Sequence, residues 1–121
     1  MDARTLASVR ATGANDFSNR RSGERKVCRV SGMLRLMDRE PLRVRVLDIS
    51  SSGIALLCPQ SLANGTIGEV HFTIAVNGSL QQITARLEVT NNVFLSTDIR
   101  IGCRFLALGA SAKNAITEYV R

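Results

Sequence analysis

The sequence predicts a mainly β protein, a small six-stranded antiparallel barrel followed by a short C-terminal helix. Apolar and polar residues alternate at period two in successive segments between residues 27 and 108, and turn residues separate these segments. The final stretch, 111–121, changes to a helical spacing of apolar side chains. Closing six strands into a barrel would remove the exposed edges of such a sheet. A chain of 121 residues suits one domain with its own core.

Turn chemistry separates the expected strands. The segment "DREP" makes the first turn, "DISSSG" at 48–53 interrupts the second strand, and Pro59 ends the third. Asn77-Gly78 is the strongest hairpin signal and suits a type I′ turn. Gly32 is expected to form a bulge, and "NNVFLSTD" to be a long connection. The expected strands are 27–37, 42–47, 54–58, 69–76, 80–89 and 99–108.

The C-terminal stretch predicts an amphipathic helix. Ser111 is a candidate N-cap. So short a helix is marginal alone, so we expect its apolar stripe to pack on the barrel. The stripe consists of Ala112, Ala115, Ile116, Tyr119 and Val120. Residues 1–19 lack a signal-peptide core and are interpreted as a flexible N-terminal tail.

The charge and the cysteine content indicate which ligands and which compartment suit the protein. The formal net charge is +6, and every basic residue except Lys26 and Lys113 is an arginine, which pairs bidentately with phosphate and guanine. Three cysteines without a C-x-x-C spacing predict neither a disulfide framework nor a zinc site, and reduced core thiols indicate the cytoplasm. No apolar run is long enough to span a membrane.

The sequence does not predict an enzyme. His71 is the only histidine and falls on an outward strand position, so neither a metal site nor a catalytic role is expected for it. No serine has a recognisable His-Asp arrangement, and there is no phosphate-loop or dinucleotide fingerprint.

Two motifs remain. Arg20 precedes Arg21-x-x-x-Arg25, ahead of the first strand, and Asp48-x-Ser50-x-x-Gly53 follows the second. Taken singly, the first motif is typical of a solubilising basic linker. The second is typical of a turn in which Gly53 takes a positive φ. Hairpin pairing of the first two strands would bring both motifs to one end of the barrel. Guanidinium groups, a carboxylate and a hydroxyl together suit a ligand with phosphates and purine edges.

The ordered pair of motifs resembles the signature of PilZ domains, which bind the bacterial second messenger cyclic di-GMP. The 22 residues between Arg25 and Asp48 fit the family spacing, and "RIGCRFLAL" resembles the last barrel strand of the family. The resemblance implies a PilZ-like domain over 20–121 that includes an arginine loop.

The resemblance also implies roles for the motif residues. Arg21 and Arg25 would hold phosphate and a guanine edge, Asp48 and Ser50 would contact guanine, and Gly53 would allow the turn and a close approach. In the family, an arginine at the position of Arg20 is associated with two intercalated ligand molecules, so two cyclic di-GMP per chain are expected and no further cofactor.

The expected function is therefore a stand-alone receptor that binds cyclic di-GMP and signals to a separate, unidentified protein. One alternative is a PilZ-like adaptor that binds protein without nucleotide, although the intact motifs disfavour it. Another is a basic barrel that binds nucleic acid. Its stacking aromatics should lie on exposed strand faces, whereas Phe72 and Phe105 fall on inward positions.

Overall fold

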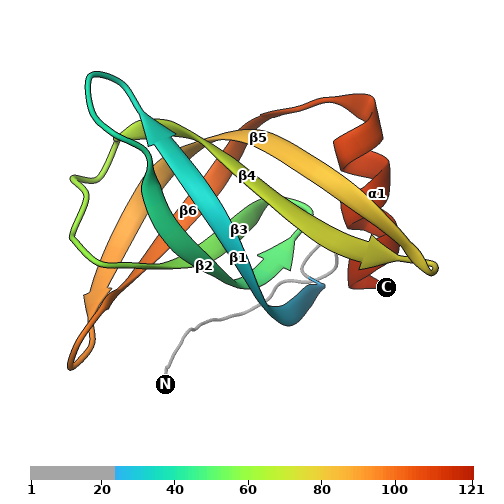
Figure 1. The fold of residues 1–121 in the computed structure, drawn as a ribbon, viewed down its shortest axis with the longest axis horizontal. Helices are drawn as coiled ribbons and strands as arrows, with labels where there is room; N and C mark the ends of the chain where they lie inside the picture. Colours follow the sequence, from blue (N-terminus) through green and yellow to red (C-terminus); the bar gives the residue numbers. More distant parts are fainter. Residues whose placement is uncertain (1–23) are drawn as a thin grey trace.

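The computed structural model describes residues 24–121, which form a closed barrel of six antiparallel strands with one helix packed against it (Figure 1). Around the barrel the strand order is β1-β2-β3-β6-β5-β4, and β4 pairs with β1 to close the ring. The predicted fold class is confirmed. The expected flexible tail, 1–19, lies outside the described residues. The elements are β1 (Arg25–Leu36), β2 (Leu42–Ser50), β3 (Gly53–Cys58), β4 (Ile67–Val76), β5 (Ser79–Phe94), β6 (Ile99–Leu108) and α1 (Ala110–Val120).

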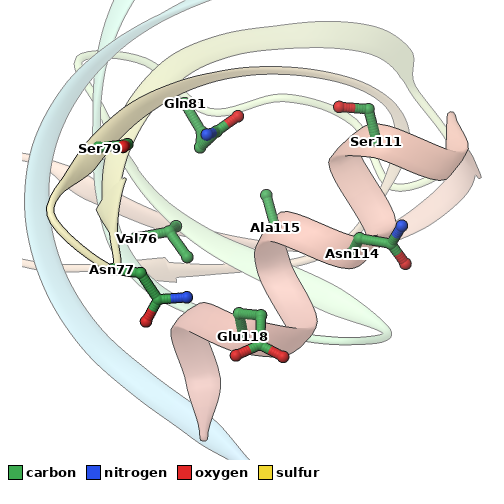
Figure 2. Close-up of a pocket in the computed structure, with 8 residues that line it drawn as sticks. All are labelled: Val76, Asn77, Ser79, Gln81, Ser111, Asn114, Ala115 and Glu118. Atoms are coloured by element: carbon green, nitrogen blue, oxygen red, sulfur yellow. The ribbon is translucent and has the colours of Figure 1, made fainter.

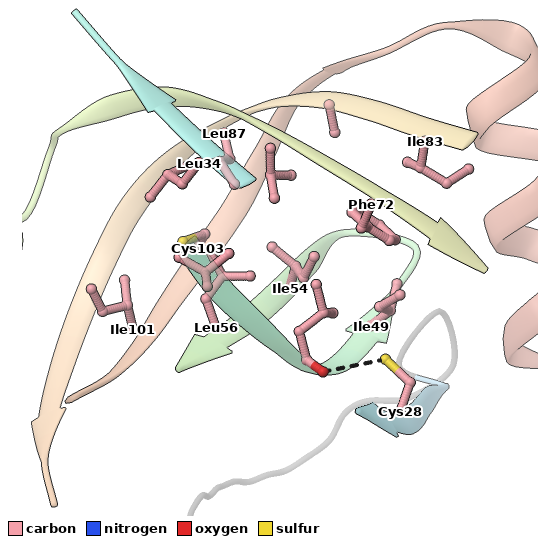
Figure 3. Packing of buried hydrophobic residues seen from close by; sticks show 14 of the residues in the cluster. Cys28, Leu34, Ile49, Ile54, Leu56, Phe72, Ile83, Leu87, Ile101 and Cys103 are labelled. Carbon is pink, nitrogen blue, oxygen red and sulfur yellow. Dashed lines mark hydrogen bonds between the residues drawn. The ribbon is translucent and has the colours of Figure 1, made fainter. Parts of the chain in front are cut away.

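The barrel interior is filled by aliphatic side chains, a phenylalanine and three free cysteines, of which Figure 3 labels Cys28 and Cys103. Leu34, Leu56 and Leu87 come from three different strands and are each 0% exposed. Burying one such side chain contributes about 1.5–3 kcal/mol. The alternation predicted for 69–76 and 80–89 is confirmed, because their inward residues are buried.

The hairpin turn predicted at Asn77-Gly78 is also confirmed. Both residues have positive φ, 51° and 81° respectively, as a type I′ turn requires. The bulge expected at Gly32 is wrong. Gly32 sits in regular register with Val44 and Phe72, and a Cβ there would lie 3.0 Å from the His71 carbonyl oxygen. The register shift of β1 falls instead between Val27 and Val30.

Strand β2 runs further than the sequence pattern indicated. Residues 48–50 belong to β2, because all three pair with β1, and Asp48 and Ile49 also pair with β3. A register shift between Val46 and Asp48 changes the inward face, so that Val46 and then Ile49 enter the core. The intervening Asp48 therefore lies on the outer face of the barrel.

Strand β5 is also longer than expected. The segment 91–94, expected to be part of a connection, pairs with β6 in a hairpin that projects away from α1 (Figure 1). Only Leu95–Asp98 forms the turn, closed by a 2.9 Å bond from the Leu95 amide to the Asp98 carbonyl. Polar asparagines favoured a loop locally, but pairing with β6 satisfies the backbone of both strands.

Helix α1 covers the barrel with the predicted stripe, and Ala115 and Ile116 are buried. The predicted cap is wrong. Ser111 lies inside the helix, and Gly109 is the N-cap, without a side-chain hydrogen bond. The Lys26 ammonium lies 4.2 Å from the centre of the Tyr119 ring, which joins the helix to the start of β1. Within residues 24–121, no helix has the length and apolar character needed to cross a membrane.

Candidate functional site

The site is built around one carboxylate held between two arginines. Arg25 pairs through Nη1 with Oδ1 of Asp48, and Arg100 pairs through Nη2 with Oδ2 at 2.7 Å. The Asp48 side chain is 13% exposed, whereas those of Arg25 and Arg100 are 55% and 42% exposed. The carboxylate is thus fixed near the barrel wall, while both guanidinium groups reach solvent.

Strand pairing explains why these residues meet. Arg25 begins β1 opposite Ser50 at the end of β2, so the hairpin returns the second motif to the first. The expected meeting of the two motifs is confirmed for Arg25, Asp48 and Ser50. Arg20 and Arg21 lie outside the described residues, so their contribution stays a prediction.

Ser50 builds the turn between β2 and β3. It is 2% exposed, and its hydroxyl oxygen accepts the Gly53 amide at 3.1 Å and the Ser52 amide at 3.3 Å. The hydroxyl also donates to the Gly53 carbonyl at 3.4 Å, so in this conformation the backbone occupies both its acceptor and its donor. Any ligand contact by Ser50 requires this turn to rearrange.

The positive φ expected for Gly53 is wrong, because the described glycines with positive φ are Gly65 and Gly78. The close approach expected at this position is present. A Cβ on Gly53 would lie 2.4 Å from the Cys103 carbonyl oxygen, since β3 and β6 run together there. Glycine is required by the neighbouring backbone and not by the local dihedral.

A depression of about 380 Å³ lies beside this ion-pair cluster on the outer face of the barrel. Its floor is made by residues with little or no side chain, Ala55 of β3 and Gly102 of β6, which are partners in the sheet register. Ala55 points away from the core yet is 4% exposed, because the rim covers it. The polar rim consists of Arg25, Asp48, Thr90, Asn91 and Arg100.

The chemistry of the rim suits an anion with a flat polar group. Two arginines against one carboxylate leave an excess positive charge, and their remaining N–H groups can serve phosphate or purine acceptors. Asp48 can accept hydrogen bonds from a purine edge. A floor without bulky side chains leaves room for a ring.

Sequence reasoning missed Arg100 as a site residue. A usable signal existed, because Arg100 holds an outward position in "IRIGCRF", between the inward Ile99 and Ile101 of an alternating strand. Its closeness to Asp48 could not be read from spacing, since 52 positions separate the pair. It follows from β3 pairing with both β2 and β6.

The other reactive groups are satisfied or buried. His71 lies on the outer face, with Nε2 2.9 Å from a Glu69 oxygen and Nδ1 3.1 Å from the Thr84 hydroxyl, which agrees with the surface role expected for it. Burial raises the pKa of the Cys28 and Cys58 thiols and raises the pKa of Cys103 to about 12. No set of potential metal-binding side chains is grouped together within residues 24–121.

A second cavity of about 510 Å³ lies between α1 and the β4–β5 turn (Figure 2). Asn77, Gln81 and Asn114 line it above an apolar base of Val76 and Ala115. Its one charged residue is an acid, Glu118. A cavity with that charge does not suit a phosphate ligand, so the arginine-rimmed depression is the better candidate although it is smaller.

Fold and site together define a small β-barrel binding domain with a basic, polar depression on its outer wall. The PilZ domain family model matches residues 19–121, and the chain belongs to the PilZ family. No curated protein matches the sequence.

Solved structures with the same fold include the inhibitor of motility MotI (DgrA) of Bacillus subtilis, with a TM-score of 0.75 and 17% identity over 85% of this chain. The PilZ domain of YcgR from Escherichia coli, solved with c-di-GMP, has a TM-score of 0.55 and 18% identity over 76% of this chain and 79% of that one. The chain spans 50% of the MotI chain and 42% of a longer YcgR chain, also solved with c-di-GMP. At these identities the likeness establishes the fold.

Proposed function

We propose that this protein is a cytoplasmic receptor for cyclic di-GMP that passes its signal to a separate protein and catalyses no reaction. The observation that carries the proposal is the Asp48 carboxylate held between Arg25 and Arg100 at the rim of the depression. Family membership and the c-di-GMP held by the structurally similar YcgR domain support it.

In the proposed complex each side chain has a role that follows from its chemistry. Asp48 accepts hydrogen bonds from N1 and N2 of a guanine, and an arginine donates to O6 and N7 of the same base. Arg25 and Arg21 hold phosphate, since charge-assisted bonds to phosphate are strong and bidentate. Arg20 supplies the added positive charge that a second, intercalated ligand molecule requires.

Ligand entry requires the ion pairs of Asp48 to be exchanged. Arg25 is more than half exposed and lies at the end of its strand, so its side chain can turn from Asp48 to a phosphate. Exposed ion pairs are worth at most about 1 kcal/mol, so this exchange costs little. In the ligand-free protein, these ion pairs therefore hold the site residues together at little cost to ligand affinity.

Isothermal titration calorimetry with cyclic di-GMP tests the proposal. Arg21→Ala and Arg25→Ala should each remove bonds worth about 1.5–3 kcal/mol, which weakens binding by about one to two decades. Arg43→Ala is the matched control, because it removes the same positive charge from the protein. Arg43 is exposed on the outer wall but lies outside the depression. GTP and a short single-stranded RNA should bind far more weakly than cyclic di-GMP. Wild-type affinity in both motif variants would overturn the assignment.

A further inference from the structure

Two consecutive asparagines near the end of β5 are used in different ways. Asn92 uses both ends of its carboxamide to hold a loop: Oδ1 accepts the Leu62 amide at 3.0 Å, and Nδ2 donates to the Leu62 carbonyl at 2.7 Å. Asn91 uses one end, where Oδ1 accepts the Gly102 amide at 3.1 Å. Within residues 24–121, no hydrogen bond is made by Nδ2 of Asn91.

The orientation of the Asn91 carboxamide follows from this bond. A backbone N–H can only donate, so the end of the carboxamide that faces Gly102 must be the oxygen. The approach is close, since a Cβ on Gly102 would lie 2.4 Å from Oδ1 of Asn91. Gly102 thereby lets the carboxamide settle against β6 with its NH₂ group unused.

A register shift places Asn91 on the rim of the depression. The shift between Val89 and Asn91 leaves Val89 in the core and puts both Thr90 and Asn91 on the rim of the depression. Thr90 also has a bond to β6, from its hydroxyl to the Gly102 carbonyl at 3.0 Å. The rim opposite Asp48 therefore presents a fixed, neutral donor.

Asn91 lies at the far end of one row across the sheet. The register places Asp48 opposite Ala55, Ala55 opposite Gly102, and Gly102 opposite Asn91. Measured along the curved sheet, three strand spacings of roughly 14 Å in all separate the ends of the row. A guanine that presents N1 and N2 to Asp48 carries its glycosidic nitrogen on the opposite side of the ring. If the ring lies along this row, over the floor of Ala55 and Gly102, its sugar and phosphate extend toward Asn91.

We propose that Asn91 is a further ligand-binding residue, whose Nδ2 donates a hydrogen bond to a phosphate oxygen of the bound nucleotide. This inference rests on the proposed function, because it takes the orientation of the nucleotide from Asp48. It explains why a polar side chain with a free donor stands beside a floor of Ala55 and Gly102.

Exchanging Asn91 for aspartate separates a structural role from a binding role. Asn91→Asp keeps an oxygen to accept the Gly102 amide, but it replaces the donor with an acceptor and adds a negative charge beside the phosphate. Calorimetry with cyclic di-GMP should show affinity weakened at least tenfold in Asn91→Asp and less in Asn91→Ala. Added salt should narrow the difference between the two variants, because it screens the like charges.

Asn92→Asp is the control. It breaks the bond to the Leu62 carbonyl and should lower the melting temperature, yet it should leave affinity at 25 °C unchanged. Wild-type affinity in Asn91→Asp, with Asn91→Ala weakened, would show that Asn91 acts only by holding Gly102 and would overturn the inference alone. Failure of the wild-type protein to bind cyclic di-GMP would overturn the proposed function, and the inference with it.

Discussion

We expect the carboxylate of Asp48 to contribute more to ligand binding than to the stability of the fold. Both of its arginine partners are substantially exposed, so solvent screens the two ion pairs. The Asp48→Asn variant keeps the shape of the side chain and removes its charge. We expect its free energy of unfolding to change by no more than about 2 kcal/mol, about 1 kcal/mol for each pair.

The same variant should bind cyclic di-GMP at least tenfold more weakly, because a carboxamide accepts more weakly from guanine and presents an unmatched donor. Urea unfolding and calorimetry on one preparation check both parts. A large loss of stability with unchanged affinity would show that the carboxylate serves the fold instead.

Gly53 is needed for close packing against β6 and not for a positive φ. Its place after three serines suggests a positive φ, but the close contact with Cys103 depends on β6, which lies far along the chain. Gly53→Ala should therefore destabilise the protein by about 1–3 kcal/mol through overcrowding. Gly109→Ser is a suitable control, because nothing lies within 4 Å of a Cβ there and serine is a good N-cap. Equal melting temperatures for the two variants would contradict the crowding explanation.

The buried thiols predict a stability that depends on pH. Cys103 keeps its proton in the folded state up to a pKa of about 12, against an ordinary value of 9.0. The unfolded chain loses this proton first, so the stability that Cys103 contributes is present below pH 9 and declines as pH rises from 9 toward 12. Urea titrations at pH 8 and pH 10 should show a smaller decrease for Cys103→Ala than for the wild type. Equal decreases in the free energy of unfolding of both proteins would show that the Cys103 thiol is not the cause.

At the scale of elements, alternation predicted every strand, but it did not predict the register shifts, three of which lie near the site. These shifts lie at 27–30 in β1, 46–48 in β2 and 89–91 in β5. Each depends on the partner strand, so no local pattern marks it. Two of them turn Asp48 and Asn91 outward, toward the depression. Polar residues that read as loops from sequence are therefore strand residues of the candidate site.

Helix α1 offers a direct measure of docking on the barrel. Ile116 is 1% exposed, so Ile116→Ala should cost about 2–5 kcal/mol. Tyr119 lies in the same helix, and the chain has one tyrosine and no tryptophan. Its near-ultraviolet circular dichroism therefore reports on the helix–barrel contact and should weaken in this variant. Thr117→Ala, on the exposed side of the helix, is the control. An unchanged tyrosine signal together with unchanged stability would mean that the helix is not held by this contact.

At the scale of the whole molecule, a closed barrel leaves its outer wall free for ligands. Six strands satisfy one another, so the depression needs no sheet edge and can be lined by outward residues of neighbouring strands. Formal net charge of +6 adds a general attraction for anions. The sequence predicted the closed barrel and the positive charge. It did not predict which residues line the depression, because that depends on which outward residues the strand register brings together.

The ligand count is the last property of the whole molecule to be predicted, and it rests on Arg20. One cyclic di-GMP has two phosphates, so an intercalated pair brings twice the negative charge of a single ligand into one site. Arg25 and Arg100 are already offset in part by Asp48. A second ligand therefore needs further positive charge, and a guanidinium can also stack on its exposed guanine. We expect two ligands per wild-type chain, and Arg20→Leu should shift the calorimetric stoichiometry from two toward one.

Arg43→Leu removes the same charge from the outer wall away from the depression and should leave the count at two. The active fraction of each preparation must be measured, because inactive protein lowers an apparent count without any change at the site. A wild-type value near one, at ligand concentrations well above saturation, would show that Arg20 does not recruit a second ligand. In that case Arg21 and Arg25, with Asp48, would suffice for the single molecule bound.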